Sequence, residues 1–357
     1  MDNKPFKFYY LEGGRFFHLT GILLSCFILL AVLQLSAQHL SYKNYNVEDG
    51  LSSSIVHDML QDQRGYIWFA TERGVSVFDG HSFENITTKN GLAENDIRSI
   101  HEDSQGRIWF LTLTGGISYY LDNKVYNPGN DPLLAEVNAG SMFTSFLEDD
   151  KGNIWLAAIS NGVYKLGPDK VERFDTSAGL HSNNVFYLWP GENGGVSGFL
   201  IGNEMFTITD DSISHRSTEH DFITGFTRLA DGGVLYPSYD KLIRLTNDTT
   251  EEMNLPGFDV IFKKGITWLE ETADNDLWFG TIFDGVYYYG KDSSITVDVF
   301  DHFMAGKRVS SILKDGEGNL WFTTIGEGVY FLASSAREIL AFSVIDGLSD
   351  NRAYAIS

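Results

Sequence analysis

The sequence predicts an all-β fold assembled from repeats of about 40 residues, on three observations. Short strings centred on tryptophan, such as IWF, recur along the 357-residue chain. Gly and Asp residues recur at fixed distances from the tryptophan. Between them lie short runs rich in β-branched and aromatic side chains, which are typical of strands. Four such runs in each repeat indicate the blades of a β-propeller.

The tryptophans set the number of repeats. Their spacings are 41, 46, 123 and 43 residues, for Trp68, Trp109, Trp155, Trp278 and Trp321. Because 123 is three times 41, the long gap holds two more repeats, and degenerate copies stand at 185–208 and 222–245. The sequence therefore predicts a seven-bladed β-propeller of four-stranded antiparallel blades over residues 38–343. The five tryptophans are expected to pack between blades, because each stands at the same repeat position.

Each clear repeat also carries a turn signal. An Asp stands six residues before the tryptophan in four repeats, as Asp62, Asp103, Asp149 and Asp315, and a Gly three residues before it. Asp can bond its own backbone and Gly adopts positive φ, so a tight turn is expected there. Upstream of the turn, apolar residues recur three apart, a helical spacing. The segment is too short for a stable helix, so we expect a strand.

Residues 1–37 read as a signal peptide. A basic start is followed by the 15-residue apolar run Gly21 to Leu35 and by the small residue Ala37, after which we expect cleavage. An uncleaved signal anchor is the alternative, since Leu19 to Leu35 can just span a thinned bilayer. A lipoprotein signal at Cys26 fits less well, because that residue stands at the start of the apolar run. Cys26 is the only cysteine, which excludes an intrachain disulfide and a CxxC metal or redox site.

The charge balance excludes one broad class of partner. The chain has 26 Lys and Arg against 48 Asp and Glu, a net charge of −22. Such a chain repels phosphate backbones, so general nucleic-acid binding is not expected. Anionic lipid surfaces are disfavoured for the same reason.

The repeat resembles a known family. GLSSSIV at 50–56, QDQRGYIWFATERGVSVFDGHSFENIT at 61–87 and GL at 91–92 are similar to the two-component regulator propeller repeat. That repeat occurs in the periplasmic sensor regions of membrane histidine kinases, especially in Bacteroidetes, and the resemblance covers residues 41–357. It implies one or two seven-bladed propellers followed by a β-sandwich, a transmembrane helix and a kinase. Residues 344–357 restart the first-repeat string, so we expect an eighth repeat of a second propeller in a longer sensor.

Local motifs give no sign of catalysis. The sequence has no nucleophile elbow, phosphate loop or dinucleotide fingerprint, and the histidines after the signal share no repeat position and form no HxH or HExxH pair. The acidic strings at 148–153 and 315–319 fall on turns and lack calcium-loop spacing. We therefore expect no catalytic residue, no metal site and no cofactor. A propeller enzyme that draws residues from several blades leaves no local signature, so that alternative stays open.

The expected topology selects a face for ligands. In a four-stranded meander, the loop before the first strand and the loop between the second and third strands emerge on the same side, here called the loop face. Its polar residues are candidates for ligand binding. They are Glu72, Arg73, Asn95, Asp96, Asn161, Asn183, Asn184, Asp284 and Glu327. Trp189 and Trp268 lie outside the repeat register and are further candidates.

Together these observations predict a periplasmic, ligand-sensing propeller that passes a conformational change to a kinase. The ligand is expected to be a small molecule, with an oligosaccharide as one candidate, and the full-length sensor a homodimer anchored in the inner membrane. Two alternatives are a secreted propeller enzyme, a lyase or hydrolase acting on polysaccharide, and a protein-interaction platform. The strand that closes the ring also stays open between residues 39–46 and 339–343.

Overall fold

The computed structural model describes residues 42–191, 194–210, 212–218, 226–229, 231–246, 249–255, 257–271, 276–282, 284–289 and 304–334. These residues belong to one compact unit, Ser41–Ser357. The expected signal peptide and eighth repeat lie outside the described residues. Within the described ranges, no helix has both the length and the apolar character needed to cross a membrane.

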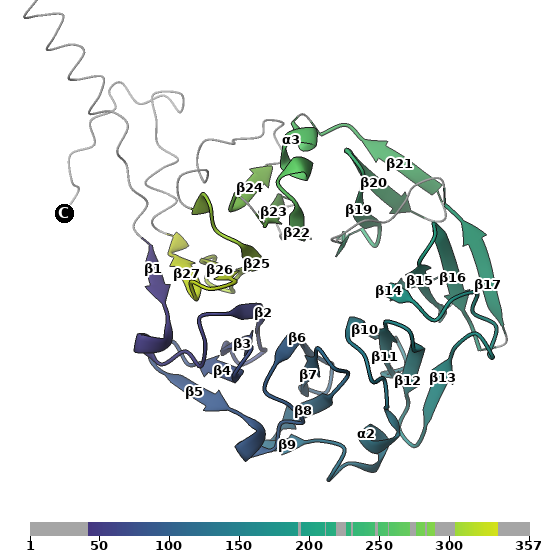
Figure 1. The fold of residues 1–357 in the computed structure, drawn as a ribbon, viewed down its shortest axis with the longest axis horizontal. Helices are drawn as coiled ribbons and strands as arrows, with labels where there is room; N and C mark the ends of the chain where they lie inside the picture. The colour runs from purple at the N-terminus through teal and green to yellow at the C-terminus, as the bar shows by residue number, and fades with distance from the viewer. Residues whose placement is uncertain are drawn as a thin grey trace, which may run out of the picture. The chain divides into compact units, whose positions relative to one another are not determined.

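The strands form seven antiparallel sheets that follow one another around a ring (Figure 1). Blades 1 to 7 are numbered in chain order, and in each the first strand lies innermost. The innermost strands are β2 (Val56–Gln61), β6 (Ile97–Glu102), β10 (Phe143–Glu148), β14 (Val185–Pro190), β18 (Thr227–Arg228), β22 (Ile266–Glu271) and β25 (Val309–Lys314). The seven-bladed, all-β prediction is confirmed.

The middle of each blade consists of two fully paired strands. The second strands are β3 (Ile67–Thr71), β7 (Ile108–Thr112), β11 (Ile154–Ala158), β15 (Val196–Leu200), β19 (Val234–Ser238), β23 (Leu277–Thr281) and β26 (Leu320–Thr324). The third strands are β4 (Gly74–Phe78), β8 (Ile117–Leu121), β12 (Gly162–Leu166), β16 (Glu204–Ile208), β20 (Lys241–Thr246), β24 (Val286–Tyr289) and β27 (Val329–Leu332). Every residue of each second strand is buried, which explains why these strands are mostly apolar and do not alternate with polar residues.

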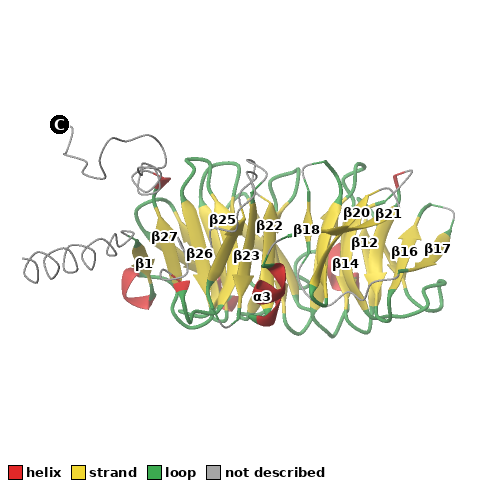
Figure 2. Ribbon diagram, turned by 90° about the horizontal axis from the view of Figure 1, so that it is seen from above, coloured by secondary structure: helices red, strands yellow, loops and turns green. Residues whose placement is uncertain are grey.

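The outermost strands lie at the rim of the ring and are more exposed. They are β5 (Phe83–Ile86), β9 (Lys124–Tyr126), β13 (Val171–Phe174), β17 (Ile213–Ser217) and β21 (Thr249–Met253). In blade 6 the described residues form three strands. Figure 2 shows the strands standing side by side, with loops at both ends of the blades.

The ring closes through its first strand. β1 (Lys43–Tyr45) pairs antiparallel with β27, in the register Lys43↔Phe331 to Tyr45↔Val329 (Figure 1). Of the two segments that the sequence left open, 39–46 therefore supplies the outer strand of blade 7. Because β1 precedes blade 1 in the chain and pairs in blade 7, the start and the end of the ring are held together by backbone hydrogen bonds.

The segment with helical spacing is a strand in every clear repeat. Each of β2, β6, β10, β22 and β25 carries a one-residue bulge near its start, between Val56 and Asp58 in β2. A bulge inserts one extra residue, which shifts the alternation of faces along the strand. The bulge accounts for apolar residues that recur three apart without a helix.

The turn acid and the tryptophan form one unit. In blade 2, Asp103 Oδ1 accepts the backbone N–H groups of Gln105 at 2.9 Å and Arg107 at 3.0 Å. Its Oδ2 accepts the Trp109 indole N–H at 2.7 Å. The same indole bond occurs at 3.0 Å in blade 1, 2.7 Å in blade 3 and 2.8 Å in blade 7. The acid therefore satisfies both the turn and a buried indole, which the sequence pattern showed only as a turn.

The core lies between neighbouring blades. Trp68 of blade 1 is 1 % exposed and its ring centroid lies 5.1 Å from that of Tyr120 in blade 2. Trp109 contacts Phe146 of blade 3, and Trp321 contacts Phe69 of blade 1, each with centroids 6.0 Å apart. Each tryptophan thus joins two sheets, in addition to filling its own.

Short helices occupy some connections between blades. They are η2 (Val47–Asp49), η3 (Thr88–Asn90), α2 (Pro132–Glu136) and α3 (Phe258–Lys263). After η2 and η3 the chain turns at Gly50 and Gly91, with φ of 108° and 110°. Only glycine adopts this conformation without strain, and the turn brings the chain to the start of the next innermost strand.

Candidate functional site

The loop-face residues predicted from the sequence lie in two kinds of segment, the loop before the first strand and the loop between the second and third strands. In blade 1 the turn at Glu72 and Arg73 lies beside the loop that leads into β2. Ser53 Oγ donates to Glu72 Oε1 at 3.1 Å, and the Glu72 N–H donates to the carbonyl of Ile55. The expected arrangement of the two segments on one side is therefore present.

The side chains of the four predicted asparagines are engaged in local hydrogen bonds, three of them with backbone N–H groups of the loops. Their side-chain oxygens accept hydrogen bonds from Thr88 N to Asn95 at 2.8 Å, Thr176 N to Asn183 at 2.8 Å, Ser160 N to Asn184 at 2.9 Å and Arg173 Nη2 to Asn161 at 3.1 Å. An amide committed to a local turn has less capacity to bind a ligand.

The predicted acids of blades 6 and 7 repeat one local arrangement. Each carboxylate lies between a lysine of the preceding loop and a tyrosine of the third strand: Asp284 with Lys264 and Tyr287, and Glu327 with Lys307 and Tyr330. The lysine is the main cause that lowers the pKa of each carboxyl group. These acids are therefore ionised and paired at neutral pH.

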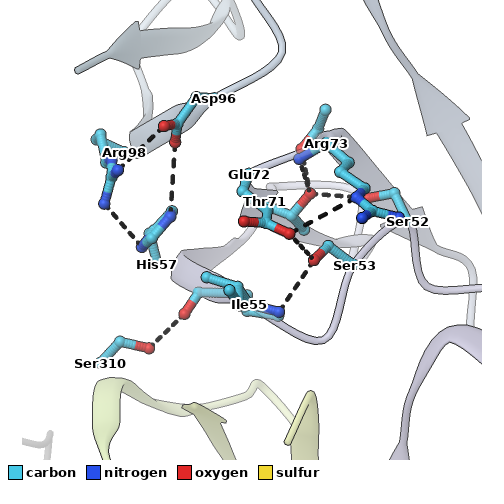
Figure 3. A network of polar contacts seen from close by, with 12 residues as sticks. Ser52, Ser53, Ile55, His57, Thr71, Glu72, Arg73, Asp96, Arg98 and Ser310 are labelled. Carbon is cyan, nitrogen blue, oxygen red and sulfur yellow. Dashed lines mark hydrogen bonds and ion pairs between the residues drawn. The ribbon is translucent and has the colours of Figure 1, made fainter. Parts of the chain in front are cut away.

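Asp96 belongs to a different arrangement, formed by His57, Asp96 and Arg98 and here called the His57 cluster (Figure 3). Arg98 Nη2 lies 3.0 Å from Asp96 Oδ2, and Arg98 Nη1 lies 3.4 Å from His57 Nδ1. His57 Nε2 lies 3.6 Å from Asp96 Oδ1. Because arginine can only donate, His57 Nδ1 is the acceptor and the ring proton is on Nε2, toward Asp96.

The His57 cluster is incompletely satisfied. Within the described ranges, His57 Nε2, Asp96 Oδ1 and Arg98 Nε are buried and have no hydrogen-bond partner. Burial, and then the charge of Arg98, lower the pKa of His57, against the carboxylates of Asp96 and Glu72. The ring is therefore neutral at pH 7. One neutral donor, one carboxylate oxygen and one guanidinium nitrogen together can bind a small polar molecule.

Comparison of the blades shows that the His57 cluster departs from the repeat. His57 and Arg98 are the second residues of their innermost strands. The second residues of three other blades donate a hydroxyl to the next blade: Thr144 to Val185 O at 2.8 Å, Thr267 to Val309 O at 2.6 Å and Ser310 to Val56 O at 2.6 Å. Blades 1 and 2 therefore lack this link and have titratable side chains in its place.

In blade 1, the third residue of the innermost strand also differs from the residue that the repeat has at this position. Asp58 Oδ2 accepts the N–H of Ile100 in blade 2 at 3.1 Å. Ser145 makes the equivalent link in blade 3, accepting the N–H of Leu188 at 3.0 Å. Burial raises the pKa of Asp58 to about 7, against hydrogen bonds from backbone N–H groups and from Ser311. An acid thus replaces a hydroxyl at a buried contact between blades.

Two other titratable groups lie on innermost strands. Burial, and then the charge of Asp58, raise the pKa of Glu270 in β22 to about 7. Burial lowers the pKa of His101 in β6 to about 4, and its ring stacks on Phe146 at 4.6 Å. Asp58, Glu270, His57 and Arg98 were not among the predicted site residues. Comparing equivalent positions of the innermost strands in the sequence would have marked Asp58, His57 and Arg98.

A cavity lies between blades 4 and 5, with a volume of about 510 Å³. Its lining includes Trp189, Ser197, His215 and Arg216. Ser197 is the second residue of β15 and so stands where the clear repeats have tryptophan. The predicted candidate Trp189 lines this cavity, whereas the indole N–H of Trp268, in β22, is buried without a hydrogen-bond partner in the described part of the chain.

Three segments of the chain match the family model described as two component regulator propeller. They are residues 50–73, 91–114 and 304–326, which fall in blades 1, 2 and 7. Three of the seven blades therefore contain segments similar to two component regulator propeller repeats. No curated protein matches the chain.

Solved structures share the fold at low sequence identity. The extracellular domain of BT3049 of B. thetaiotaomicron, assigned as a hybrid two component system, aligns with a TM-score of 0.66 at 18 % identity, over 82 % of this chain and 42 % of that one. Virginiamycin B lyase of Staphylococcus aureus aligns at 0.61 and 14 %, over 83 % and 99 %. PorZ of Porphyromonas gingivalis, a surface component of the type-IX secretion system, aligns at 0.59 and 16 %, over 82 % and 48 %. The chain spans less than half of the first and third of these.

Proposed function

We propose that this chain is the extracytoplasmic sensor propeller of a two component system and that it binds a small polar ligand at the His57 cluster. The repeats support the first part, because they match a family model named for two component regulators. The fold shared with extracellular domains of such systems is consistent with it. The sensor role predicts export, with removal of residues 1–37, and a kinase in the full-length protein.

The single observation that supports the ligand site is the incomplete pairing of the His57 cluster. A buried donor or acceptor without a partner is costly, and a ligand that supplies the partners recovers that free energy. Hydroxyl groups can both donate and accept, so they match an arginine, a carboxylate and a neutral histidine together. We therefore propose a polyhydroxylated ligand, such as an oligosaccharide.

The ligand is tested by thermal denaturation of the mature chain against a panel of neutral and acidic oligosaccharides. A ligand that binds only the folded chain stabilises it by RT ln(1 + [L]/Kd), so the melting temperature rises with ligand concentration. Arg98→Thr and His57→Thr install the residue that Thr144 and Thr267 represent in other blades, and each should abolish the shift produced by a hit. Glu84→Gln, on the exposed strand β5, should leave it unchanged. A hit whose shift survives both threonine variants places the ligand elsewhere.

The signalling role is tested separately by sequencing the DNA beyond the codon for Ser357. A frame that continues through further repeats to a transmembrane segment and a histidine kinase supports the sensor proposal. A stop codon directly after Ser357 contradicts it. N-terminal sequencing of the chain recovered from the periplasm should begin at Gln38, and recovery of an intact N-terminus in the membrane fraction would instead support the signal anchor.

A propeller lyase is the second candidate function. Asp58 and Glu270, each with a pKa of about 7, have the titration range of general acids and bases, and two lyases share the fold. β-Elimination from a polyuronate creates a double bond that absorbs ultraviolet light. A steady rise of absorbance with the wild-type chain that is lost in Glu270→Gln would favour the enzyme over the sensor.

A further inference from the structure

We propose that blade 4 carries a binding site for a divalent transition-metal ion, with Zn²⁺ the best fit, formed by His181, Glu204 and His215. The three residues come from the loop that leads into β14, the start of β16 and the outer strand β17. One ligand atom from each lies within 4.8 Å of the others. His181 Nδ1 is 2.6 Å and His215 Nδ1 is 3.2 Å from Glu204 Oε1.

The orientation of His215 is the strongest support for the site. Its Nε2 lies 2.9 Å from the carbonyl oxygen of Gly179. Because a carbonyl only accepts, the ring proton is on Nε2, and Nδ1 keeps its lone pair. That Nδ1 is buried and, in the part of the chain that the structure describes, has no hydrogen-bond partner. A metal-binding histidine commonly donates its second nitrogen to a backbone carbonyl in this way.

The repeats show what His215 has replaced. In blade 1, Asn85 of the outer strand donates Nδ2 to the carbonyl of Gly50 at 2.9 Å, and in blade 2 Asn127 donates to Gly91 at 2.7 Å. Gly179 is the equivalent turn glycine, with φ of 117°. His215 keeps the bond that anchors this turn. It adds a second nitrogen that the anchor does not need.

The other two positions depart from the repeat as well. His181 follows Gly179 by two residues, where blade 1 has Ser52 after Gly50. Glu204 opens the third strand of its blade, where blades 1 and 3 have glycine because a Cβ would meet the backbone of the outer strand. In blade 4 the outer strand extends to pair Ser217 with Glu204, and Asn203 takes the positive φ, at 62°. Three departures in one blade thus bring three metal-ligating groups to one point.

The donor set selects the kind of ion. Two imidazole nitrogens and one carboxylate oxygen suit Zn²⁺ and its neighbours, whereas Ca²⁺ and Mg²⁺ prefer oxygen ligands alone. The rings of His181 and His215 are stacked, with centroids 3.6 Å apart and planes 4° apart, so one ion cannot lie in both ring planes. The His181 side chain is 61 % exposed and can turn on binding, whereas His215, at 12 %, is held by its carbonyl bond.

Three protein ligands leave one position of a tetrahedral ion open to water or to an exogenous ligand. His215 also lines the cavity between blades 4 and 5, so the ion would lie at the edge of that cavity. This site lies on a different blade from the His57 cluster, and neither proposal depends on the other.

The test is a calorimetric titration of the metal-stripped mature chain with ZnCl₂, together with its melting temperature in Zn²⁺, Mg²⁺ and Ca²⁺. We expect one Zn²⁺ per chain with micromolar or tighter affinity, a higher melting temperature in Zn²⁺, and no shift in the other two. His215→Asn installs the residue of blade 1 and keeps the turn anchored, so it should fold normally and weaken binding at least about tenfold. His181→Ser, which also copies blade 1, should act in the same way.

Two controls keep the result interpretable. His81→Asn removes an exposed histidine of the β4–β5 turn and should bind Zn²⁺ like the wild type. Co²⁺ in place of Zn²⁺ should give the visible absorption of a tetrahedral site, and His215→Asn should lose it. The proposal is wrong if the wild-type chain takes up no stoichiometric Zn²⁺, or if both blade-4 variants bind Zn²⁺ and Co²⁺ unchanged while retaining the wild-type melting temperature in EDTA.

Discussion

Blades 2 and 3 share their strand arrangement with blades 4 and 5, but the two pairs of blades have different kinds of residue at one buried position. Equivalent positions are identified by a backbone hydrogen bond at the start of the turn in each of these four blades. It runs from Asp103 N to Arg107 O, Asp149 N to Asn153 O, Gly191 N to Gly195 O and Leu229 N to Gly233 O. Six residues after the first residue of each bond stand Trp109, Trp155, Ser197 and Leu235. Blades 4 and 5 have therefore lost the acid and the tryptophan together.

The joint loss follows from the cost of an unpaired buried group. An indole N–H without its acid, or an acid without its indole, would be buried and incompletely bonded. Removing both partners avoids that cost, but the space that the indole would fill must then be filled by other side chains or left empty. In blade 4 the result is the cavity beside Ser197, and the metal-ligating cluster lies in the same blade. Residues that follow the repeat pattern pack neighbouring blades together, whereas residues that differ from it can serve in binding.

The comparison is tested most directly by making blade 2 resemble blade 4. Trp109→Ser deletes a side chain that is 1 % exposed and leaves Asp103 without its indole partner. We expect a loss of about 3–5 kcal/mol in the free energy of unfolding, typical of truncating a fully buried aromatic residue. Urea denaturation measures it. Ser197→Ala at the equivalent position of blade 4 should cost less than about 1 kcal/mol, and equal losses at the two positions would contradict the comparison.

Asp58 tests whether reversion to the repeat residue is stabilising. Its pKa is about 7 in the folded chain, above its ordinary value, so between pH 4 and pH 7 the unfolded chain releases a proton that the folded chain keeps. Stability therefore falls as pH rises through that window, and the penalty is complete above pH 7. Asp58→Ser, which installs the residue found at Ser99, Ser145 and Ser311, removes the penalty.

We expect Asp58→Ser to be more stable than the wild type by roughly 1–3 kcal/mol at pH 8 and no more stable at pH 4. Denaturant midpoints at the two pH values measure the difference. The variant should also lower the pKa of Glu270, because the charge of Asp58 contributes to its elevation. A variant less stable than the wild type at pH 8 would show that the hydrogen bonds of the ionised acid outweigh the cost of burying its charge.

A smaller effect is expected from the turn acid alone. Asp103→Asn keeps an oxygen for the turn N–H groups and directs an amide N–H₂ at the Trp109 indole N–H, so two donors face each other. The expected loss is about 1–2 kcal/mol. In the Trp109→Ser background the same change should cost less, because its partner is gone. Additive losses in this double-mutant cycle would mean that the acid and the tryptophan act independently.

The fold could be predicted from the sequence because the repeats mark equivalent positions along the chain. The spacing of Trp68, Trp109 and Trp155 fixed the repeat length, and the multiple of that length before Trp278 fixed the number of blades that had lost the residue. The helical spacing of Val56 and Met59 was correctly overruled by segment length, and the bulge supplies its physical cause. The sequence did not decide which strand closes the ring, because a three-residue edge strand such as Lys43–Tyr45 has no periodic signal of its own.

The candidate sites were harder to predict from the sequence. Their residues differ from the repeat pattern, and a search for shared residues does not detect them. The two loop segments lie side by side in blade 1 as expected, yet Asn95 and Asn183 hold turns that their side chains cap. His181, Glu204 and His215 are separated by 23 and 11 residues and form no local motif. The pairing of β16 with β17 and the bond from His215 to Gly179 bring them together, so they are found only when the blades are aligned residue by residue.

The smallest effect on stability is expected at the His57 cluster, and that is informative. Arg98→Thr removes the Asp96 ion pair, which is about one-third exposed and contributes little, and the long 3.4 Å hydrogen bond to His57 Nδ1. It also installs the hydroxyl that Thr144 uses to bond the next blade, so gain and loss nearly cancel and the free energy of unfolding should change by less than about 1 kcal/mol. A side chain that costs nothing to replace but departs from the repeat is retained for something other than folding. Loss of oligosaccharide binding in a variant of wild-type stability would show that function, whereas a loss of several kcal/mol would make Arg98 a structural residue.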